Sequence, residues 1–277
     1  MATQRPPRSA RRVVPALGDP IRIVPLHLPR ELVAPAPGIA APPAAALTYR
    51  SGPLLDAVEV FTLFWGTAWN DPASQNIAQG LNRFFGFLVT SAYLDQLAEY
   101  GVPQHAIGHG RVTGTATVAD ATLGTNVTDS AIQHMLQREI ASGAGGAGGA
   151  GGSGGVPAPN ANSLYFVYLP PGVSVSAGGD RSCQAFCGYH DHIQTQVYYA
   201  VVPYPNCPGC LGQLGTLDAL TSVSSHELAE AITDPVPGQG WYDDNHGEIG
   251  DICAWQNKKL GTYVVQLLWS NKAGACV

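Results

Sequence analysis

The sequence predicts an α+β fold in which helices pack on one mixed β-sheet. Two observations indicate this fold class. Apolar and β-branched runs with strand character alternate along the chain with segments of helical periodicity. Hydrophobic residues also make up 45% of the 277 positions, which is enough to bury a sizeable core.

The strands are expected where short apolar or alternating runs are bounded by turn residues. They cover residues 58–66, 111–118, 163–169, 195–202 and 262–269. The helices are expected where apolar residues recur three or four positions apart. They cover residues 73–100, 129–140 and 217–233. Thr216 is a candidate N-cap for the last helix, and Pro235 disfavours its extension through Asp234.

Composition divides the chain into an N-terminal arm and one domain. Residues 1–50 are rich in Pro, Ala and Arg without periodicity, which predicts a disordered or pro-segment-like arm. Residues 51–277 are expected to form a single domain. Within it, residues 143–155 hold nine glycines in 13 positions, which predicts a flexible insertion.

The charge pattern narrows the function classes. A net charge of −6 argues against nucleic acid as the main partner, and no apolar run approaches the ~18 residues of a membrane span. Residues 225–251 contain seven acids and neither Lys nor Arg. Acids without local counter-charge either face water or hold a cation.

The central motif is His226-Glu227-Leu-Ala-Glu230, on the predicted helix over residues 217–233. Positions i and i+4 lie on one helix face, so His226 and Glu230 can hold one metal ion. Glu227 can then act as the base that takes a proton from an activated water. This is the geometry of the His-Glu-x-x-His helix of zinc peptidases, with Glu in place of the second His. The motif therefore predicts a zincin-like fold with a central metal-site helix.

The third ligand is expected downstream, from Glu248 or Asp251. Zn²⁺ is the predicted ion, because a set of one His and two carboxylates suits it. A carboxylate in place of an imidazole also broadens the range of acceptable metals, so Mn²⁺ and Ca²⁺ remain open. In the alternative without metal, these acids belong to an ordinary helix surface.

Two further segments carry candidate ligands. His190 and His192 alternate on an extended segment, which indicates an edge strand lining the cleft, with His190 contacting substrate or metal. The alternative for His190 is a structural histidine. The run Asp243–Gly247 resembles part of a calcium loop, but Ala254 occupies the position of its bidentate Glu.

Six cysteines invite a disulfide interpretation. By proximity they form the pairs Cys183/Cys187, Cys207/Cys210 and Cys253/Cys276, although 15 connectivities exist. We predict the Cys253–Cys276 bridge, which would hold the Glu248–Asp251 segment near the helix. For the other four, a redox Cys-x-x-Cys motif and a four-thiolate zinc knuckle stay open.

Several motifs occur in order between residues 50 and 277. They include Gly52-Pro-Leu-Leu55, Cys187-Gly-Tyr-His190, the His226–Glu230 motif and Glu248-Ile-Gly-Asp-Ile-Cys253-Ala-Trp255. Together they resemble the exordium / phosphate-induced protein 1 family, with the Gly-rich insertion as a departure. The resemblance implies an extracellular, disulfide-bonded protein linked to growth. No secretory signal is recognised at the N-terminus.

These features predict a secreted zinc-dependent hydrolase, most consistent with a peptidase. We expect Glu227 and His190 as its catalytic residues. The expected partners are a peptide or cell-surface substrate, and the expected state is a monomer. The alternative is a non-catalytic extracellular binding or growth-signalling protein on the same fold.

Overall fold

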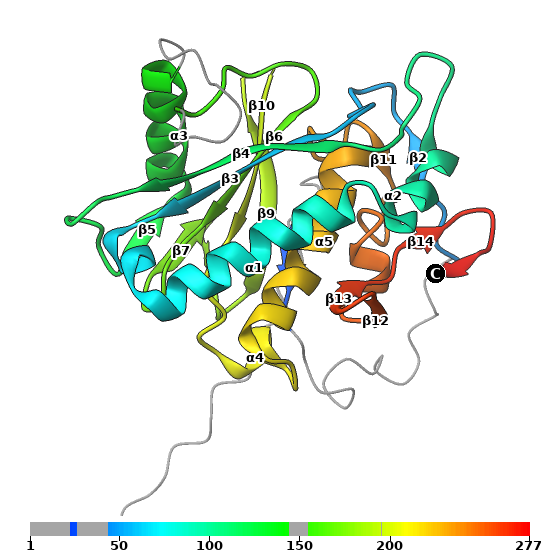
Figure 1. Cartoon of the computed structure of the whole chain (residues 1–277). Helices are drawn as coiled ribbons and strands as arrows, with labels where there is room; N and C mark the ends of the chain where they lie inside the picture. The colour runs from blue at the N-terminus through cyan, green and yellow to red at the C-terminus, as the bar shows by residue number, and fades with distance from the viewer. Residues whose placement is uncertain (1–22, 27–43, 144–154, 195) are drawn as a thin grey trace, which may run out of the picture.

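The structure, a computed structural model, describes residues 23–26, 44–143, 155–194 and 196–277 (Figure 1). It is a mixed α+β fold built on a six-stranded sheet, as the sequence predicts at this coarse level. The strand order is β1 (Ile23–Pro25), β9 (Phe186–Ile193), β10 (Val197–Val202), β6 (Ser163–Tyr168), β3 (Glu59–Trp65) and β4 (Arg111–Val118). The four strands from β10 to β4 run parallel, while β9 is antiparallel to both of its neighbours.

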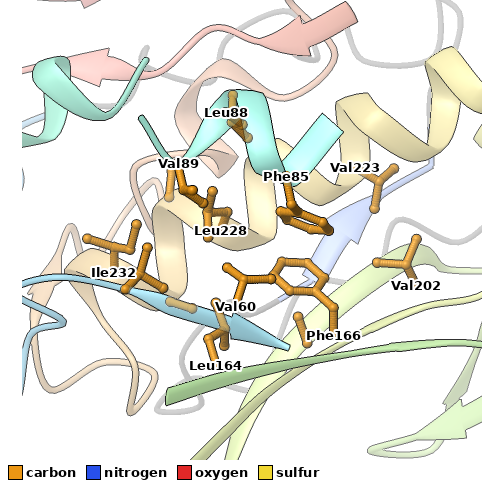
Figure 2. Close-up of a cluster of buried hydrophobic side chains, with 14 of the residues drawn as sticks. Val60, Phe85, Leu88, Val89, Leu164, Phe166, Val202, Val223, Leu228 and Ile232 are labelled. Atoms are coloured by element: carbon orange, nitrogen blue, oxygen red, sulfur yellow. The ribbon is translucent and has the colours of Figure 1, made fainter. Parts of the chain in front are cut away.

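Helices cover both faces of this sheet (Figure 1). Alternate side chains of each strand point to opposite faces, so each face has its own apolar core. On one face lie α1 (Pro72–Leu88), α2 (Ala92–Leu97) and α5 (Thr216–Thr233). Figure 2 shows Val60 and Phe166 of the sheet facing Phe85 of α1 and Leu228 of α5. The opposite face is covered by α3 (Asp129–Gly143).

The predicted helix over residues 73–100 is wrong as a single helix. The first of the two observed helices, α1, is capped by Asp71, whose side chain accepts a hydrogen bond from Ala73 N–H at 3.0 Å. It ends at Leu88, and Ser91 then caps α2 by accepting from Tyr93 N–H at 3.2 Å. The apolar periodicity continues across the break because both helices pack on the same core, which hides the second start from a pattern search.

The predicted strand over residues 262–269 also divides. Its first part is β13 (Tyr263–Gln266), paired with β12 (Asn257–Leu260) rather than with the main sheet. Its end contributes β14 (Trp269–Ser270), paired with β15 (Ala275–Cys276). The β12–β13 hairpin lies against α5.

Short elements complete the described chain. Three strands form a small sheet, β5 (Asn126–Thr128), β7 (Ser174–Ala177) and β8 (Asp180–Arg181), and β2 (Thr48–Tyr49) pairs with β11 (Trp241–Tyr242). The short helices are η2 (Thr67–Asn70), η3 (Ala98–Tyr100), α4 (Pro208–Leu211) and η4 (Asp251–Cys253). Among the described residues, no helix combines the length and hydropathy that crossing a bilayer requires.

The predicted N-terminal arm, residues 1–50, contains two described strands. β1 pairs with β9, and Val24 of β1 is fully buried against the α5 face. β2 pairs with β11. Residues 1–22 and 27–43 of the arm lie outside the described residues, as do residues 144–154 of the predicted insertion.

The six cysteines form three disulfides, and the predicted Cys253–Cys276 bridge is confirmed. Pairing by proximity is wrong for the other four, which bond crosswise as Cys183–Cys207 and Cys187–Cys210. Both crosswise bridges tie the start of β9 to α4, so these cysteines form neither a Cys-x-x-Cys redox pair nor a thiolate zinc site. Disulfides persist in oxidising compartments, which is consistent with an extracellular protein.

Candidate metal centre

The site is built on α5, which runs through the interior of the molecule. Every residue from Ala219 to Thr233 is buried. Leu228 and Ile232 belong to the apolar core, while His226, Glu227 and Glu230 turn their polar groups into a shared interior cluster. The helix begins at Thr216 with Gly215 at its N-cap, so the predicted capping role of Thr216 is wrong.

β9 brings His190 to this helix. Its residues alternate between the two sheet faces, and His190 lies opposite Ala200 of β10 on the face that α5 covers. Close approach depends on Gly188, because a Cβ there would lie 2.6 Å from Cγ1 of Val223 and 3.0 Å from Oε1 of Glu227. β9 is not the edge strand predicted from the alternating histidines, since β1 takes that place.

The segment after β11 supplies the remaining carboxylates, Glu248 and Asp251. It crosses directly over α5 at Gly250, where a Cβ would lie 2.8 Å from both Oε1 of Glu230 and Nδ1 of His226. Asp251 begins η4, and its N–H donates to Oε1 of Glu230 at 3.1 Å. The six predicted site residues therefore come from one strand, one helix and one loop, and meet in a single cluster.

Two groups of three possible ligands can be distinguished within the cluster. His226, Glu230 and Asp251 form the first, and His190, Glu230 and Glu248 the second; in each, the ligand atoms lie within 4.8 Å of one another. Glu230 belongs to both groups. Its Oε1 lies 2.8 Å from Nε2 of His226, and its Oε2 lies 3.6 Å from Nδ1 of His190.

His190 touches the other two glutamates of the cluster as well. Its Nδ1 lies 3.3 Å from Oε2 of Glu227, and its Nε2 lies 3.4 Å from Oε1 of Glu248. The same Nε2 is 3.1 Å from the carbonyl oxygen of Asp234, the residue that follows α5. A carbonyl can only accept, so Nε2 carries a proton and donates to it.

Burial and charge shift the ionisation of the helix residues. Burial raises the pKa of Glu227 to about 7, with Glu230 adding to the rise and His190 opposing it. Burial would also raise the pKa of Glu230, but His226 and His190 lower it to about 2. Burial lowers the pKa of His226, yet the facing carboxylates raise it to about 9.

The two loop carboxylates respond to the same environment. Burial raises the pKa of Glu248 well above its usual range, and the nearby Glu230 adds to the rise. Burial and Glu230 act on the pKa of Asp251 in the same direction. Without a cation the cluster must therefore take up protons to exist inside the protein.

Within the described chain, most of the buried polar atoms without a hydrogen-bond partner lie in this cluster. Eight buried side-chain atoms of the described residues lack a hydrogen-bond partner, and six of them belong to five cluster residues. They are Nε2 of His226, Oε1 of Glu227, Oε2 of Glu230, both carboxylate oxygens of Glu248 and Oδ1 of Asp251. Buried polar atoms are normally satisfied, so this concentration marks the cluster as a candidate cation site.

Gln266 is a site residue to which the sequence assigned no role. It ends β13, and its Nε2 lies 2.7 Å from Nδ1 of His226. The same Nε2 donates to Gly250 O at 2.9 Å, and Oε1 accepts from Trp255 N–H at 3.0 Å. The signal that the sequence offered was a polar residue, Gln266, within an otherwise apolar strand segment.

Other candidate ligands lie outside the cluster. His192 contacts Asp191, at 3.1 Å. Asp243 turns its carboxylate towards the backbone N–H groups of Ala46, Asn245 and His246, and towards the His246 ring. Oδ1 of Asp243 thus serves contacts within its own turn, and Oδ2 holds the distant Ala46.

Comparisons with known proteins give no relative: no family model, no curated protein and no solved structure matches the chain.

Proposed function

We propose that the protein is a secreted zinc-dependent hydrolase with a zincin-like site, and that its substrate is a peptide. The observation that carries the proposal is the buried group of carboxylates and imidazoles whose polar atoms lack partners. Three disulfides support placement outside the cell. The ordered motifs that resemble the exordium family agree with that location.

Three residues would bind the metal ion. His226, Glu230 and Asp251 would hold the ion, since they form one ligand group around the helix motif. Glu248 stands in the second group with His190. A bound Zn²⁺ would polarise the scissile carbonyl and acidify a water.

Glu227 would accept the proton from the attacking water. Its Oε1 has no hydrogen-bond partner, whereas its Oε2 faces His190, so Oε1 is the free acceptor. The proton would pass from Glu227 to the leaving amine as the peptide bond breaks, restoring the carboxylate. A cation beside Glu227 would favour its ionised form, which is the form that accepts a proton.

The burial of the site bears on access. His226, Glu227, Glu230 and Glu248 have no exposed surface. β1 fills the edge of β9 beside them, and Trp255 Nε1 donates to the carbonyl oxygen of Pro25 at 2.7 Å. An extended peptide can pair with that edge only after β1 leaves it, as a pro-segment-like arm would.

Burial also favours a second candidate function. Structural zinc sites are closed, whereas catalytic sites keep an open position. A non-catalytic extracellular binding or growth-signalling protein would use the ion to hold α5, β9 and the Glu248–Asp251 segment together. In that case removing the ion lowers the free energy of unfolding, and the metal-bound protein hydrolyses no peptide.

The test is Glu227→Gln in the full chain, with a peptide library as substrate. We expect Zn²⁺ binding to persist and hydrolysis to fall roughly 10²- to 10⁴-fold, because the base is lost while the ligands remain. Asp244→Asn is the control, since Asp244 is an exposed acid of the following loop. Hydrolysis unchanged by Glu227→Gln refutes the base. No hydrolysis by the wild type, either as the full chain or after limited proteolysis that removes β1, favours the binding protein.

A further inference from the structure

We infer that the cluster is a two-metal centre in which Glu230 bridges two divalent cations, one beside His226 and one beside His190. The inference rests on the proposed function only in requiring a metal, and it assigns His190 as a ligand instead of a catalytic residue. Five residues would supply the protein ligands: His226, Asp251, Glu230, His190 and Glu248.

The first argument is that the two carboxylate oxygens of Glu230 face two different histidines. Each of its oxygens faces a different imidazole, Oε1 towards His226 and Oε2 towards His190. Each imidazole also has a second carboxylate nearby: Oδ1 of Asp251 lies 3.7 Å from Nε2 of His226, and Oε1 of Glu248 lies 3.4 Å from Nε2 of His190. A carboxylate shared in this way is suited to bridge two ions about 3.5–4 Å apart.

The second argument is that candidate ligand atoms of the cluster lie close together without forming hydrogen bonds to each other. Nε2 of His226 lies 2.8 Å from Oε1 of Glu230, yet it has no hydrogen-bond partner. Oε2 of Glu230 is also unpaired, and Nδ1 of His190, 3.6 Å away, is beyond hydrogen-bond distance. Once Nε2 of His226 has given up its proton, it and Oε1 of Glu230 can offer lone pairs to one ion.

The third argument is the orientation of His190. Its Nε2–H donates to the carbonyl oxygen of Asp234, which leaves Nδ1 as the nitrogen with a free lone pair when the ring is neutral. Metal-bound histidines commonly donate their other N–H to a backbone carbonyl. Nδ1 lies 3.6 Å from Oε2 of Glu230 and 3.3 Å from Oε2 of Glu227, while Oε1 of Glu248 lies near Nε2 of the same ring.

The fourth argument is charge. Glu227, Glu230, Glu248 and Asp251 carry four negative charges when ionised, and no described ion pair joins any of them to Lys or Arg. One divalent ion would leave two of these charges to be neutralised by protons on the cluster. Two divalent ions balance all four carboxylates with both imidazoles neutral, as ligation requires.

The test is metal stoichiometry of the full chain. The protein is stripped with a chelator, titrated with Zn²⁺ by calorimetry, and its bound metal is measured by elemental analysis after gel filtration. We expect two tightly bound Zn²⁺ per chain. Loading with Mn²⁺ gives an independent readout, because two ions bridged by one carboxylate produce a spin-coupled paramagnetic resonance spectrum.

Single substitutions then locate the two ions. Glu248→Gln removes a ligand only from the His190 group, and Asp251→Asn only from the His226 group, so each is expected to bind one Zn²⁺. Asp244→Asn, an exposed neighbour in the same segment, is expected to keep two. Circular dichroism spectra show that each variant is folded.

The outcomes separate this inference from the proposed function. One Zn²⁺ per chain in the wild type, with hydrolysis present, overturns the two-metal centre and leaves the hydrolase standing. No Zn²⁺ and no hydrolysis overturns both. Two Zn²⁺ that persist in Glu248→Gln and Asp251→Asn lie elsewhere on the protein and also overturn the inference.

Discussion

At the residue scale, Gln266 controls which nitrogen of His226 carries the proton. Its amide is held by two backbone groups, Trp255 N–H and Gly250 O, so an N–H points at Nδ1 of His226. A ring that binds metal through Nε2 needs the opposite arrangement, with Nδ1–H donating. Metal binding at His226 must therefore turn this amide or break its contacts.

Substitutions of Gln266 should act in opposite directions. Gln266→Glu is expected to raise Zn²⁺ affinity roughly 10-fold, because a carboxylate accepts from both Trp255 N–H and the Nδ1–H of His226. Gln266→Met leaves two buried backbone groups unpaired and is expected to lower the free energy of unfolding by about 1–3 kcal/mol without raising affinity. Calorimetry with Zn²⁺ and ¹⁵N spectra of the ring measure both effects. An unchanged or weaker affinity in Gln266→Glu would show that the amide does not oppose metal binding.

At the element scale, the Cys253–Cys276 bridge fixes the end of η4, two residues from Asp251. The Cys183–Cys207 bridge is a matched comparison, because it closes a loop of nearly the same length away from the ligand loop. Each is expected to contribute about 3–4 kcal/mol to the free energy of unfolding by constraining the unfolded chain.

The two bridges should differ in their effect on the metal. Cys253→Ser with Cys276→Ser is expected to lose this stability and also to weaken Zn²⁺ binding, since Asp251 is no longer held. Cys183→Ser with Cys207→Ser is expected to lose stability alone. Urea unfolding of the metal-free proteins and Zn²⁺ calorimetry give the two quantities. Equal losses of affinity in both variants would mean that the bridges act only through global stability.

Elements were predictable from the sequence where burial follows a simple period. β4 alternates along its whole length, and β3 is a continuous apolar run, so the prediction places both within two residues of their ends. β9 was only indicated as an extended segment, because its polar residues Asp191 and His190 break the apolar pattern of a buried strand. The helix motif predicted that His226, Glu227 and Glu230 lie together. The partners that orient the histidines, Gln266 and the carbonyl of Asp234, depend on tertiary contacts with no sequence period.

At the scale of the whole molecule, hydrogen bonds from tyrosine hydroxyls connect α5 to the elements packed around it. Tyr93 of α2 places its hydroxyl 3.1 Å from the carbonyl oxygens of Ser225 and Gln266. Tyr168 of β6 shares a hydrogen bond of 2.7 Å with the hydroxyl of Ser224. On the far face of the sheet, Tyr199 donates to Asp129 of α3 at 2.7 Å. These phenols connect α5 to α2, β13 and β6, and connect α3 to the sheet, so their ionisation affects the whole fold.

Alkaline pH should therefore unfold the protein through these rings. Burial raises the pKa of Tyr93, Tyr168 and Tyr199 far above the unfolded value of 10.0. Their contribution is fully present below pH 10 and is lost as pH rises towards the folded pKa, because the unfolded state releases protons that the folded state keeps. One pH unit above 10 should cost about 4 kcal/mol for the three rings together. Phenolate absorbance and near-UV circular dichroism, followed together, should show these tyrosines ionising only as the tertiary signal disappears. Complete ionisation near pH 10 with the tertiary signal intact would mean that the three phenols are accessible to water and do not hold α5 in place.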